Sequence, residues 1–422
     1  MQMSERWSRA GACVGLAALA CLPVSAAWAG GPAFTRLFAP AETAQTSYLN
    51  PAGMPRIDGS AFAGQLIYGT RFSSFNTDPN RTTTAGGDPR DPKPVIVPSL
   101  YYVRPIFNED WRLGLTLNAP GGFGAANGPN WAGRYYSDQF SLIFLAATAT
   151  LARRVTPWLS LGGGASVQYT SSDATTQVVN PGPTDPDAKL DVDADGADLG
   201  YIASALFDLS DRTRFGVTWH SETDPDESVN VDLKRSTLPP ALVDAIEDAG
   251  NNVNTTLRTP QHVDLGLYHA WANGWSATVD AIWVDFSRFG LTEFRVDGNN
   301  LDTPDSNFKD FWIVTAGVEY PLADNLKGRL GALYFEQPVS NEDRTFSFAL
   351  DDAWGVGGGV IYTRRNGSRI DLNATLINVD DSPVDTGPLS ALEPRGRVAG
   401  ENGSSPWSLA LEFTYHWARP PR

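Results

Sequence analysis

The feature that most restricts the fold of this chain is a series of strand-like segments that begins at residue 60. We identify about fourteen segments in which apolar and polar residues alternate, each near the roughly 9–11 residues that cross a bilayer at a tilt. They are 60–75, 95–107, 111–119, 138–152, 158–170, 199–209, 214–221, 261–271, 275–289, 311–320, 326–336, 353–363, 369–379 and 407–417. Period two alone does not decide whether the apolar face meets lipid or a protein core.

The connections between these segments decide between the two cases. The short connections are 108–110, 153–157, 210–213, 272–274, 321–325 and 364–368, and the long ones are 76–94, 120–137, 171–198, 222–260, 290–310, 337–352 and 380–406. Such an alternation is typical of outer-membrane proteins with periplasmic turns and surface loops, and a β-sandwich has no reason to produce it. We therefore predict an all-β fold, a transmembrane antiparallel β-barrel of about fourteen strands spanning 59–417. Aromatic residues at strand ends are expected to form interfacial girdles: Trp111, Trp131, Trp158, Trp271, Trp275, Trp407 and Trp417.

The first 29 residues have the features of a cleaved secretory signal peptide. Arg6 and Arg9 precede an apolar run, and the small-residue pattern at 27–29 predicts the cleavage site. Both cysteines, Cys13 and Cys21, fall in this leader, so the exported chain has no disulfide and no thiolate metal site. A formal net charge of −16 argues against nucleic acid as a partner. We predict export to the outer membrane, and the five residues 418–422 form a periplasmic tail after the last strand.

A short motif, NPAGM, lies near the end of an unpatterned stretch, residues 30–58, that precedes the strands. Asn50, Pro51, Ala52 and Gly53 predict a sharp turn, because proline fixes its own φ and glycine tolerates a positive φ. The motif closely resembles the NPAG segment of the FadL/TodX-type outer-membrane transporters. The resemblance extends to the Trp131, Gly133, Arg134 and Tyr135 element, to WLSLGGGAS, and to the segments around 285–289 and 308–339.

This resemblance implies that 30–58 form a short hatch, or plug, inside the lumen. It also implies passive transport of hydrophobic small molecules, such as long-chain fatty acids, related lipids or hydrocarbons, by a monomer without cofactors. Pro120, Gly121 and Gly122 are the expected lateral exit, since proline lacks a ladder donor and glycine weakens a strand; access through the loops alone is the alternative. Expected partners are the substrate, outer-membrane lipid, lipopolysaccharide and the barrel-assembly machinery.

Two other functions remain open at this stage: a general diffusion porin, and an outer-membrane phospholipase-like enzyme or adhesin. Catalysis has little support, because no G-x-S-x-G motif is present. His220 and Ser221 are adjacent in the sequence and so point to opposite faces of a strand. We assign no catalytic residue and no metal site.

Two loop motifs and one set of cations complete the sequence predictions. Helical spacing of Leu242, Val243 and Ile246 predicts a surface helix that either captures apolar ligands or packs on its own loop. The acidic run DVDADG at 191–196 resembles the start of an EF-hand, but it lacks the bidentate acid and is better read as a solvated loop. The candidate contacts for a ligand carboxylate are Lys327, Arg329, Arg214, Arg288 and Arg134. The alternative is that they balance acids in the lumen such as Glu412, Asp264 and Asp280.

Overall fold

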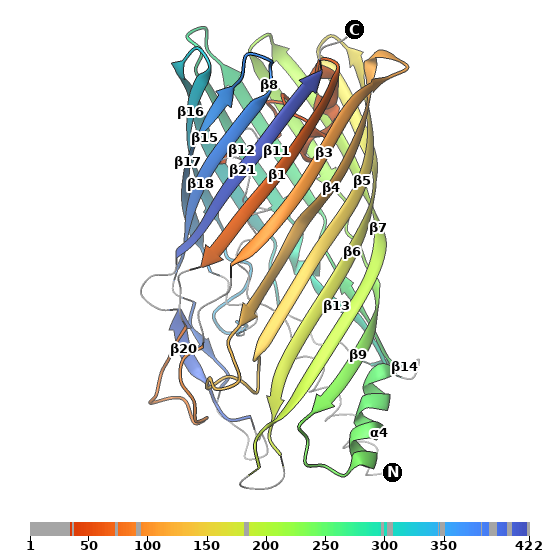
Figure 1. The fold of residues 1–422 in the computed structure, drawn as a ribbon, viewed down its shortest axis with the longest axis vertical. Coiled ribbons are helices and arrows are strands. Elements are labelled where there is room, and N and C mark those ends of the chain that lie inside the picture. The colour runs from red at the N-terminus through yellow and green to blue at the C-terminus, as the bar shows by residue number, and fades with distance from the viewer. Residues whose placement is uncertain are drawn as a thin grey trace.

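In the computed structural model, fourteen antiparallel strands form a closed barrel (Figure 1). The structure describes residues 34–35, 38–71, 75–89, 94–180, 185–296, 299–301, 307–344, 346, 351–380, 382–387, 395–402 and 407–419. The predicted signal peptide at 1–29 therefore lies outside the described residues. The barrel closes by pairing of its first and last strands, from Ser60↔Arg419 to Arg71↔Ser408. None of the described helices is long and apolar enough to cross a membrane.

The barrel strands correspond to the fourteen predicted segments. They are β1 (Ser60–Arg71), β3 (Val95–Ile106), β4 (Asn108–Ala126), β5 (Gln139–Thr156), β6 (Leu159–Val178), β7 (Ala188–Ser210), β8 (Thr213–His220), β11 (His262–Ala270), β12 (Ser276–Val284), β15 (Phe311–Ala323), β16 (Leu326–Phe335), β17 (Ala353–Thr363), β18 (Arg369–Val379) and β21 (Trp407–Arg419). The last strand ends two residues beyond the predicted boundary at Trp417.

Strand faces show which side of the barrel the apolar residues occupy. On β6, Leu161 and Val167 are 46% and 51% exposed on the outside, whereas Ser160 and Thr170 are buried inside. The same division holds on β18, where Leu372 is outside and Asp371 is inside. The apolar faces therefore point away from the lumen, as a lipid-facing surface requires.

Several strands continue beyond the barrel and form additional sheet structure in the long connections (Figure 1). β7 pairs there with β9 (Asp226–Lys234), and the further loop strands are β2 (Phe75–Thr77), β10 (Val253–Arg258), β13 (Gly290–Val296), β14 (Asn299–Leu301), β19 (Val384–Asp385) and β20 (Ala399–Asn402). The acidic run at 191–196 is part of β7, not a loop. An extended strand cannot wrap around a calcium ion, so the EF-hand resemblance does not correspond to EF-hand geometry.

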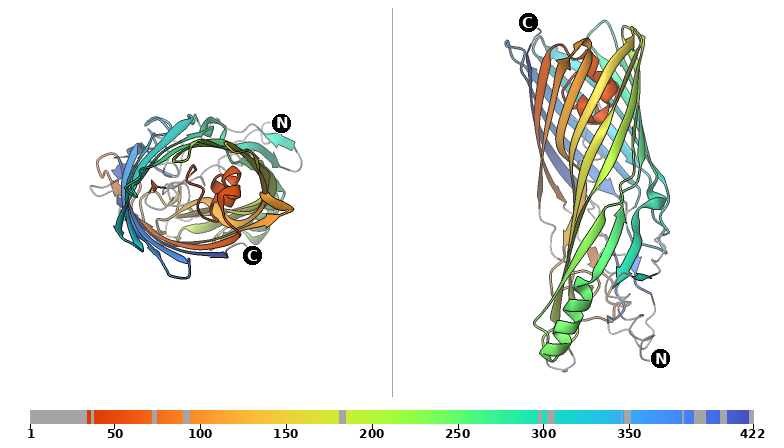
Figure 2. Two further views of the ribbon diagram at one scale, coloured as in Figure 1. Left: turned by 90° about the horizontal axis from the view of Figure 1, so that it is seen from above. Right: turned by 90° about the vertical axis from the view of Figure 1, so that its right-hand side faces the viewer.

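The chain before β1 runs inside the barrel (Figure 2). We call the described residues 34–35 and 38–58 the N-terminal segment. It contains a short helix, α3 (Thr46–Leu49), and the 3-10 helix η2 (Pro51–Arg56). The remaining helices, α4 (Pro240–Asn251) and η3 (Phe286–Arg288), lie in the long connections.

The structure contradicts the tryptophan prediction for Trp131, whereas four of the other tryptophans lie on the outer surface, where a girdle requires them. Trp158, Trp271, Trp275 and Trp417 are 40–55% exposed on the outer surface, close to the short turns. Trp131 is only 3% exposed and packs in the loop region with Phe75, Phe346, Val384 and Val398. It serves as a loop core residue because the chain after β4 leaves the barrel wall and folds over that cluster.

Candidate functional site

The barrel wall supplies the hydrogen bonds that the irregular backbone of the N-terminal segment needs. Buried carbonyl and N–H groups must find partners, and a segment without regular structure cannot pair them internally. Inward-facing side chains do so from several strands: Thr150 Oγ1 donates to Ser47 O at 3.0 Å, and Thr218 Oγ1 donates to Leu49 O at 3.0 Å. The N–H of Ala52 donates to Ser204 Oγ at 2.9 Å. Thus the segment is bound to one side of the wall, formed by β5, β7 and β8.

The NPAGM motif is at the centre of this contact surface. Asn50 is 1% exposed, and its amide donates to the carbonyl of Phe38 at 2.8 Å. Gly53 does not adopt the positive φ that its sequence context allowed; the positive φ before β1 belongs to Gly59, at 69°. Glycine is needed at 53 for space, because a Cβ there would lie 2.4 Å from the Cβ of Ala41. On the wall, a Cβ at Gly162 would lie 2.5 Å from the backbone nitrogen of Ala52.

The wall of the barrel is irregular at the predicted exit. The register of β4 against β5 shifts between Asn118 and Gly121, which leaves one extra residue on β4 at Pro120. The described pairing of β3 with β4 ends at Leu100↔Leu117, whereas β4 continues along β5 to Ala126. Consequently the two strands β3 and β4 separate beside the Pro120-Gly121-Gly122 element, as Figure 1 also shows.

A small cavity lies inside the wall at this level. Its volume is about 50 Å³, and its lining includes Pro120 and Gly121 from β4, Tyr48 from the N-terminal segment, Phe144 and His220. Tyr48 and His220 are in ring contact, with centroids 5.0 Å apart. The cavity therefore touches the N-terminal segment and the irregular part of β4 together.

An apolar cluster occupies the lumen beyond this cavity, and the sequence analysis did not predict it. Phe140, Leu142 and Phe144 of β5 point inward and pack with residues of β12, β15, β16 and η3. The rings of Phe311 and Phe335 lie 4.8 Å apart. A signal was present in the sequence: the segment QFSLIFLA is apolar on both faces, unlike the strands that alternate cleanly. The inner wall therefore has an apolar region, rich in aromatic residues, in addition to its polar ones.

Of the two cations on β16, the structure places only Arg329 deep in the lumen. Its side chain is fully buried, with Nη2 at 3.4 Å from Glu319 Oε1 and at 3.2 Å from Asp371 Oδ2. Asp371 also pairs with Arg369. Lys327 lies two residues before Arg329 and so on the same face of β16. It is exposed, however, because it lies beside the short turn at 324–325. Arg329 is therefore engaged by carboxylates of neighbouring strands.

The other three candidate cations also have their own partners, in different places. Arg214 donates to the carbonyl of Pro40 at 2.7 Å and fixes the N-terminal segment. Arg288 pairs with Glu222 at 3.2 Å, and Arg134 pairs with Asp187 at 3.0 Å. The five candidates are thus not gathered into a single cluster for a carboxylate.

The predicted surface helix is present as α4, and its apolar face packs on its own loop. Val243 and Ile246 pack with Leu190 and Leu233 of the loop sheet, while Leu242 is half-buried. Glu247 of α4 also accepts a hydrogen bond from the N–H of Leu233 at 2.9 Å. The helix therefore covers the edge of β9, which otherwise exposes unpaired backbone groups.

One carboxyl group in this loop sheet has a strongly perturbed acidity. Glu227 of β9 is 2% exposed, and it accepts a hydrogen bond from Thr255 Oγ1 at 3.3 Å. Burial, with a smaller contribution from the nearby charge of Asp195, raises the pKa of Glu227 to about 7. The group changes charge near neutral pH.

Comparisons with known proteins identify the family. A family model described as "Outer membrane protein transport protein (OMPP1/FadL/TodX)" matches residues 12–417. The long-chain fatty acid transport protein of Escherichia coli O6:H1 is 21% identical over 412 residues, covering 91% of each chain. Outer membrane protein P1 of Haemophilus influenzae is 21% identical over 66% of this chain and 64% of its own.

Solved structures have the same fold. A Pseudomonas aeruginosa FadL homologue superposes with a TM-score of 0.78 at 20% identity, covering 92% of this chain and 96% of its own. The toluene transporter TodX of Pseudomonas putida gives 0.63 at 15% identity, covering 89% and 94%. A closed barrel of fourteen strands and a family match over nearly the whole chain identify a transport protein, not an enzyme: the chain belongs to the OMPP1/FadL/TodX family of outer-membrane transport proteins.

Proposed function

We propose that this protein is a passive outer-membrane channel for hydrophobic small molecules, with long-chain fatty acids and related lipids or hydrocarbons as the substrate class. One observation carries the proposal: the N-terminal segment occupies the lumen at the level where β3 and β4 separate next to Pro120. We expect the segment to obstruct an axial water-filled path there, and the separation of β3 from β4 to provide a lateral path. A general diffusion porin needs the opposite arrangement.

The apolar cluster in the lumen supports an apolar substrate. An alkyl chain or an aromatic ring gains roughly 25 cal/mol for each Å² of apolar surface that leaves water. Phe144 belongs both to the aromatic cluster and to the lining of the cavity beside Gly121. A substrate that displaces side chains of the cluster thus reaches the cavity without crossing a polar region.

The proposed lateral exit uses the irregularity of β4. Pro120 lacks an N–H, so it cannot complete the ladder, and the extra residue bends the strand away from β3. A hydrophobic molecule leaving there enters the membrane and never has to dissolve in water. The N-terminal segment acts as the plug that prevents an axial route.

Deletion of Pro120 tests this function. Removing the extra residue restores an even register between β4 and β5, so we expect uptake of radiolabelled oleate and of toluene to fall severalfold in cells that lack their own transporter. The barrel should still form, as judged by heat-modifiable gel mobility. Pro105→Ala is the control, because Pro105 of β3 is another wall proline, located at the register shift between β3 and β4 at the short-turn end; its replacement should leave uptake unchanged.

Conductance separates this function from that of a porin. The wild-type protein should show little stable ion conductance in planar bilayers, and native mass spectrometry of the extracted protein should detect a co-purified lipid or hydrocarbon. A steady porin-like current together with normal uptake after deletion of Pro120 would refute the proposal.

The chemistry of the substrate head group is a separate part of the proposal. Because Arg329, Arg288 and Arg134 have carboxylate partners of their own and Lys327 is exposed beside a short turn, we expect binding of a fatty acid and of its neutral methyl ester to be similar. A preference for the acid that is lost in Lys327→Ala/Arg329→Ala would instead establish a carboxylate site.

We further propose that the protein works as a monomer in contact with lipopolysaccharide and that the barrel-assembly machinery inserts it.

A further inference from the structure

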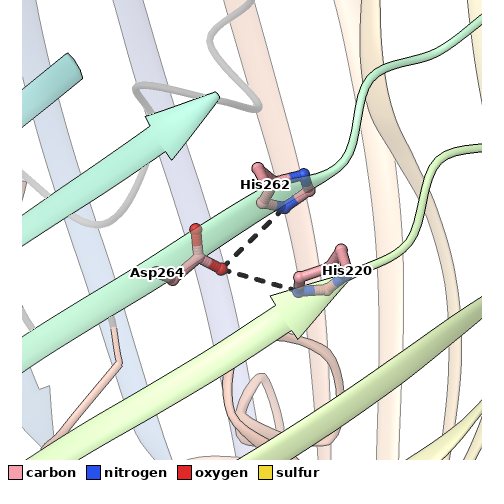
Figure 3. A group of neighbouring side chains, drawn as sticks. All are labelled: His220, His262 and Asp264. Atoms are coloured by element: carbon pink, nitrogen blue, oxygen red, sulfur yellow. Dashed lines mark ion pairs between the residues drawn. The ribbon is translucent and has the colours of Figure 1, made fainter. Parts of the chain in front are cut away.

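Two histidines and one aspartate converge on a single point of the inner wall (Figure 3). His220 is the last residue of β8, and His262 is the first residue of β11. The register pairs them directly, and Asp264 follows on the same face of β11. The two imidazole rings stack with centroids 4.4 Å apart and an interplanar angle of 12°. Residues 221–261 separate the two histidines in the sequence, so the barrel register creates the cluster.

The spacing of the three groups matches that of a metal ion's ligands. Asp264 Oδ2 lies 3.5 Å from His220 Nε2 and 3.9 Å from His262 Nε2. One ligand atom from each residue can be chosen so that all three lie within 4.8 Å of one another. A tetrahedral Zn²⁺ with bonds of about 2.0–2.2 Å needs its ligand atoms roughly 3.4 Å apart. The distances need to shorten by amounts from about 0.1 Å to at most about 1.4 Å, within reach of imidazole rotation, to give that spacing.

The charges around the cluster also favour a cation. Asp264 is 3% exposed, and within the described ranges its carboxylate contacts the two histidines and forms an ion pair with no Lys or Arg. Asp280 on the adjacent β12 is a second carboxyl group, 1% exposed, on the same inner wall. A buried carboxylate without a cation is costly. A bound divalent ion supplies the positive charge that this part of the lumen lacks.

The cavity beside the cluster leaves room for a further ligand. Its volume of about 50 Å³ exceeds the roughly 30 Å³ share of one water molecule. Its lining includes both histidines and the polar groups of Gln168 and Thr223, whose side chains hydrogen-bond to each other at 2.9 Å. A coordinated water is therefore able to complete the fourth position and to hydrogen-bond to the wall.

We propose that His220, His262 and Asp264 bind one divalent transition-metal ion, with Zn²⁺ as the representative ion, through two imidazole nitrogens and one carboxylate oxygen. Imidazole and carboxylate ligands suit Zn²⁺, Ni²⁺ and Cu²⁺ rather than Ca²⁺ or Mg²⁺, which prefer all-oxygen sites. The ion ties the end of β8 to the start of β11. It thereby fixes both ends of the long connection that carries β9, α4 and β10.

Titration calorimetry with ZnCl₂ on the folded, tag-free protein in detergent tests the site. We expect one Zn²⁺ per chain, retained in the presence of excess Ca²⁺, with affinity at least tenfold lower in His262→Ala and in Asp264→Asn. The matched control is His416→Ala, which removes another buried lumen histidine beside a carboxylate, Asp371; it should bind as the wild type does. Heat-modifiable mobility verifies that each variant is folded.

X-ray absorption of the zinc-loaded protein provides a second readout. The wild type should show nitrogen and oxygen ligands at about 2.0–2.1 Å with the scattering signature of two imidazoles. His262→Gln, which keeps a polar side chain in place, should lose one imidazole. Absence of zinc binding in the folded wild type, equal affinity in His262→Ala, or an equal loss in His416→Ala would each overturn the proposal.

Discussion

Replacement of Arg329 by methionine tests how the lumen tolerates its buried charges. Arg329 is fully buried between Glu319 and Asp371, at 3.4 Å and 3.2 Å, and methionine has a similar length without the charge. The change leaves Glu319, 3% exposed by its side chain, without the guanidinium that pairs with it. Asp371 keeps Arg369 as a partner.

The expected loss of stability follows from what happens when only one partner of a buried ion pair is removed. Removing one partner of a buried pair costs roughly 3–5 kcal/mol, because the remaining charge stays desolvated, whereas exposed pairs contribute about 0–1 kcal/mol. We expect Arg329→Met to lower the free energy of unfolding by about 3 kcal/mol, at the low end, since Asp371 remains paired. Arg365→Met is the control: Arg365 is exposed in the turn before β18, and its replacement should change stability by less than about 0.5 kcal/mol.

The measurement is reversible urea unfolding of the barrel in lipid vesicles, followed by tryptophan fluorescence. A second variant, Arg329→Met/Glu319→Gln, removes the stranded carboxylate and should recover part of the lost stability. If Arg329→Met costs less than 1 kcal/mol, or if the double variant is no more stable than the single one, the interpretation of Arg329 as a buried structural cation is wrong. Arg329 would then be available to a ligand.

Three further predictions concern topology, the plug and pH. On intact cells, trypsin should cut after Arg235, which is exposed between β9 and α4, and should spare Arg365 in a short turn; the reverse pattern would invert the barrel. Asn50→Ala/Pro51→Ala removes the hydrogen bond to Phe38 and the proline that starts η2, so ion conductance should rise while heat-modifiable gel mobility stays normal. Unchanged conductance would mean that the motif is a simple turn. Because burial raises the pKa of Glu227 from 4.5 to about 7, the contribution of Glu227 to the stability of the loop sheet is fully present below pH 4.5 and is lost as the pH rises through 7. Hydrogen exchange of β9 amides should report this loss, and Glu227→Gln should abolish it.

The sequence by itself was sufficient for the barrel. Strand number and strand location follow from period-two alternation and from the short and long connections, both of which are local properties of the chain. The same holds for α4, whose apolar spacing is visible within twelve residues. These elements are predictable because each is specified by its own residues.

The interior was decided only by the tertiary structure. Gly53 was expected to provide a turn, yet it is required for close packing against Ala41. Trp131 was expected at the membrane interface, yet it packs with Phe346 from more than 200 residues away. The partners of Arg329, and the meeting of His220 with His262, depend on which residues face each other across the barrel. A shift of one residue in register turns every side chain of a strand to the other face, so contacts inside the lumen are a property of the closed barrel and not of any single strand.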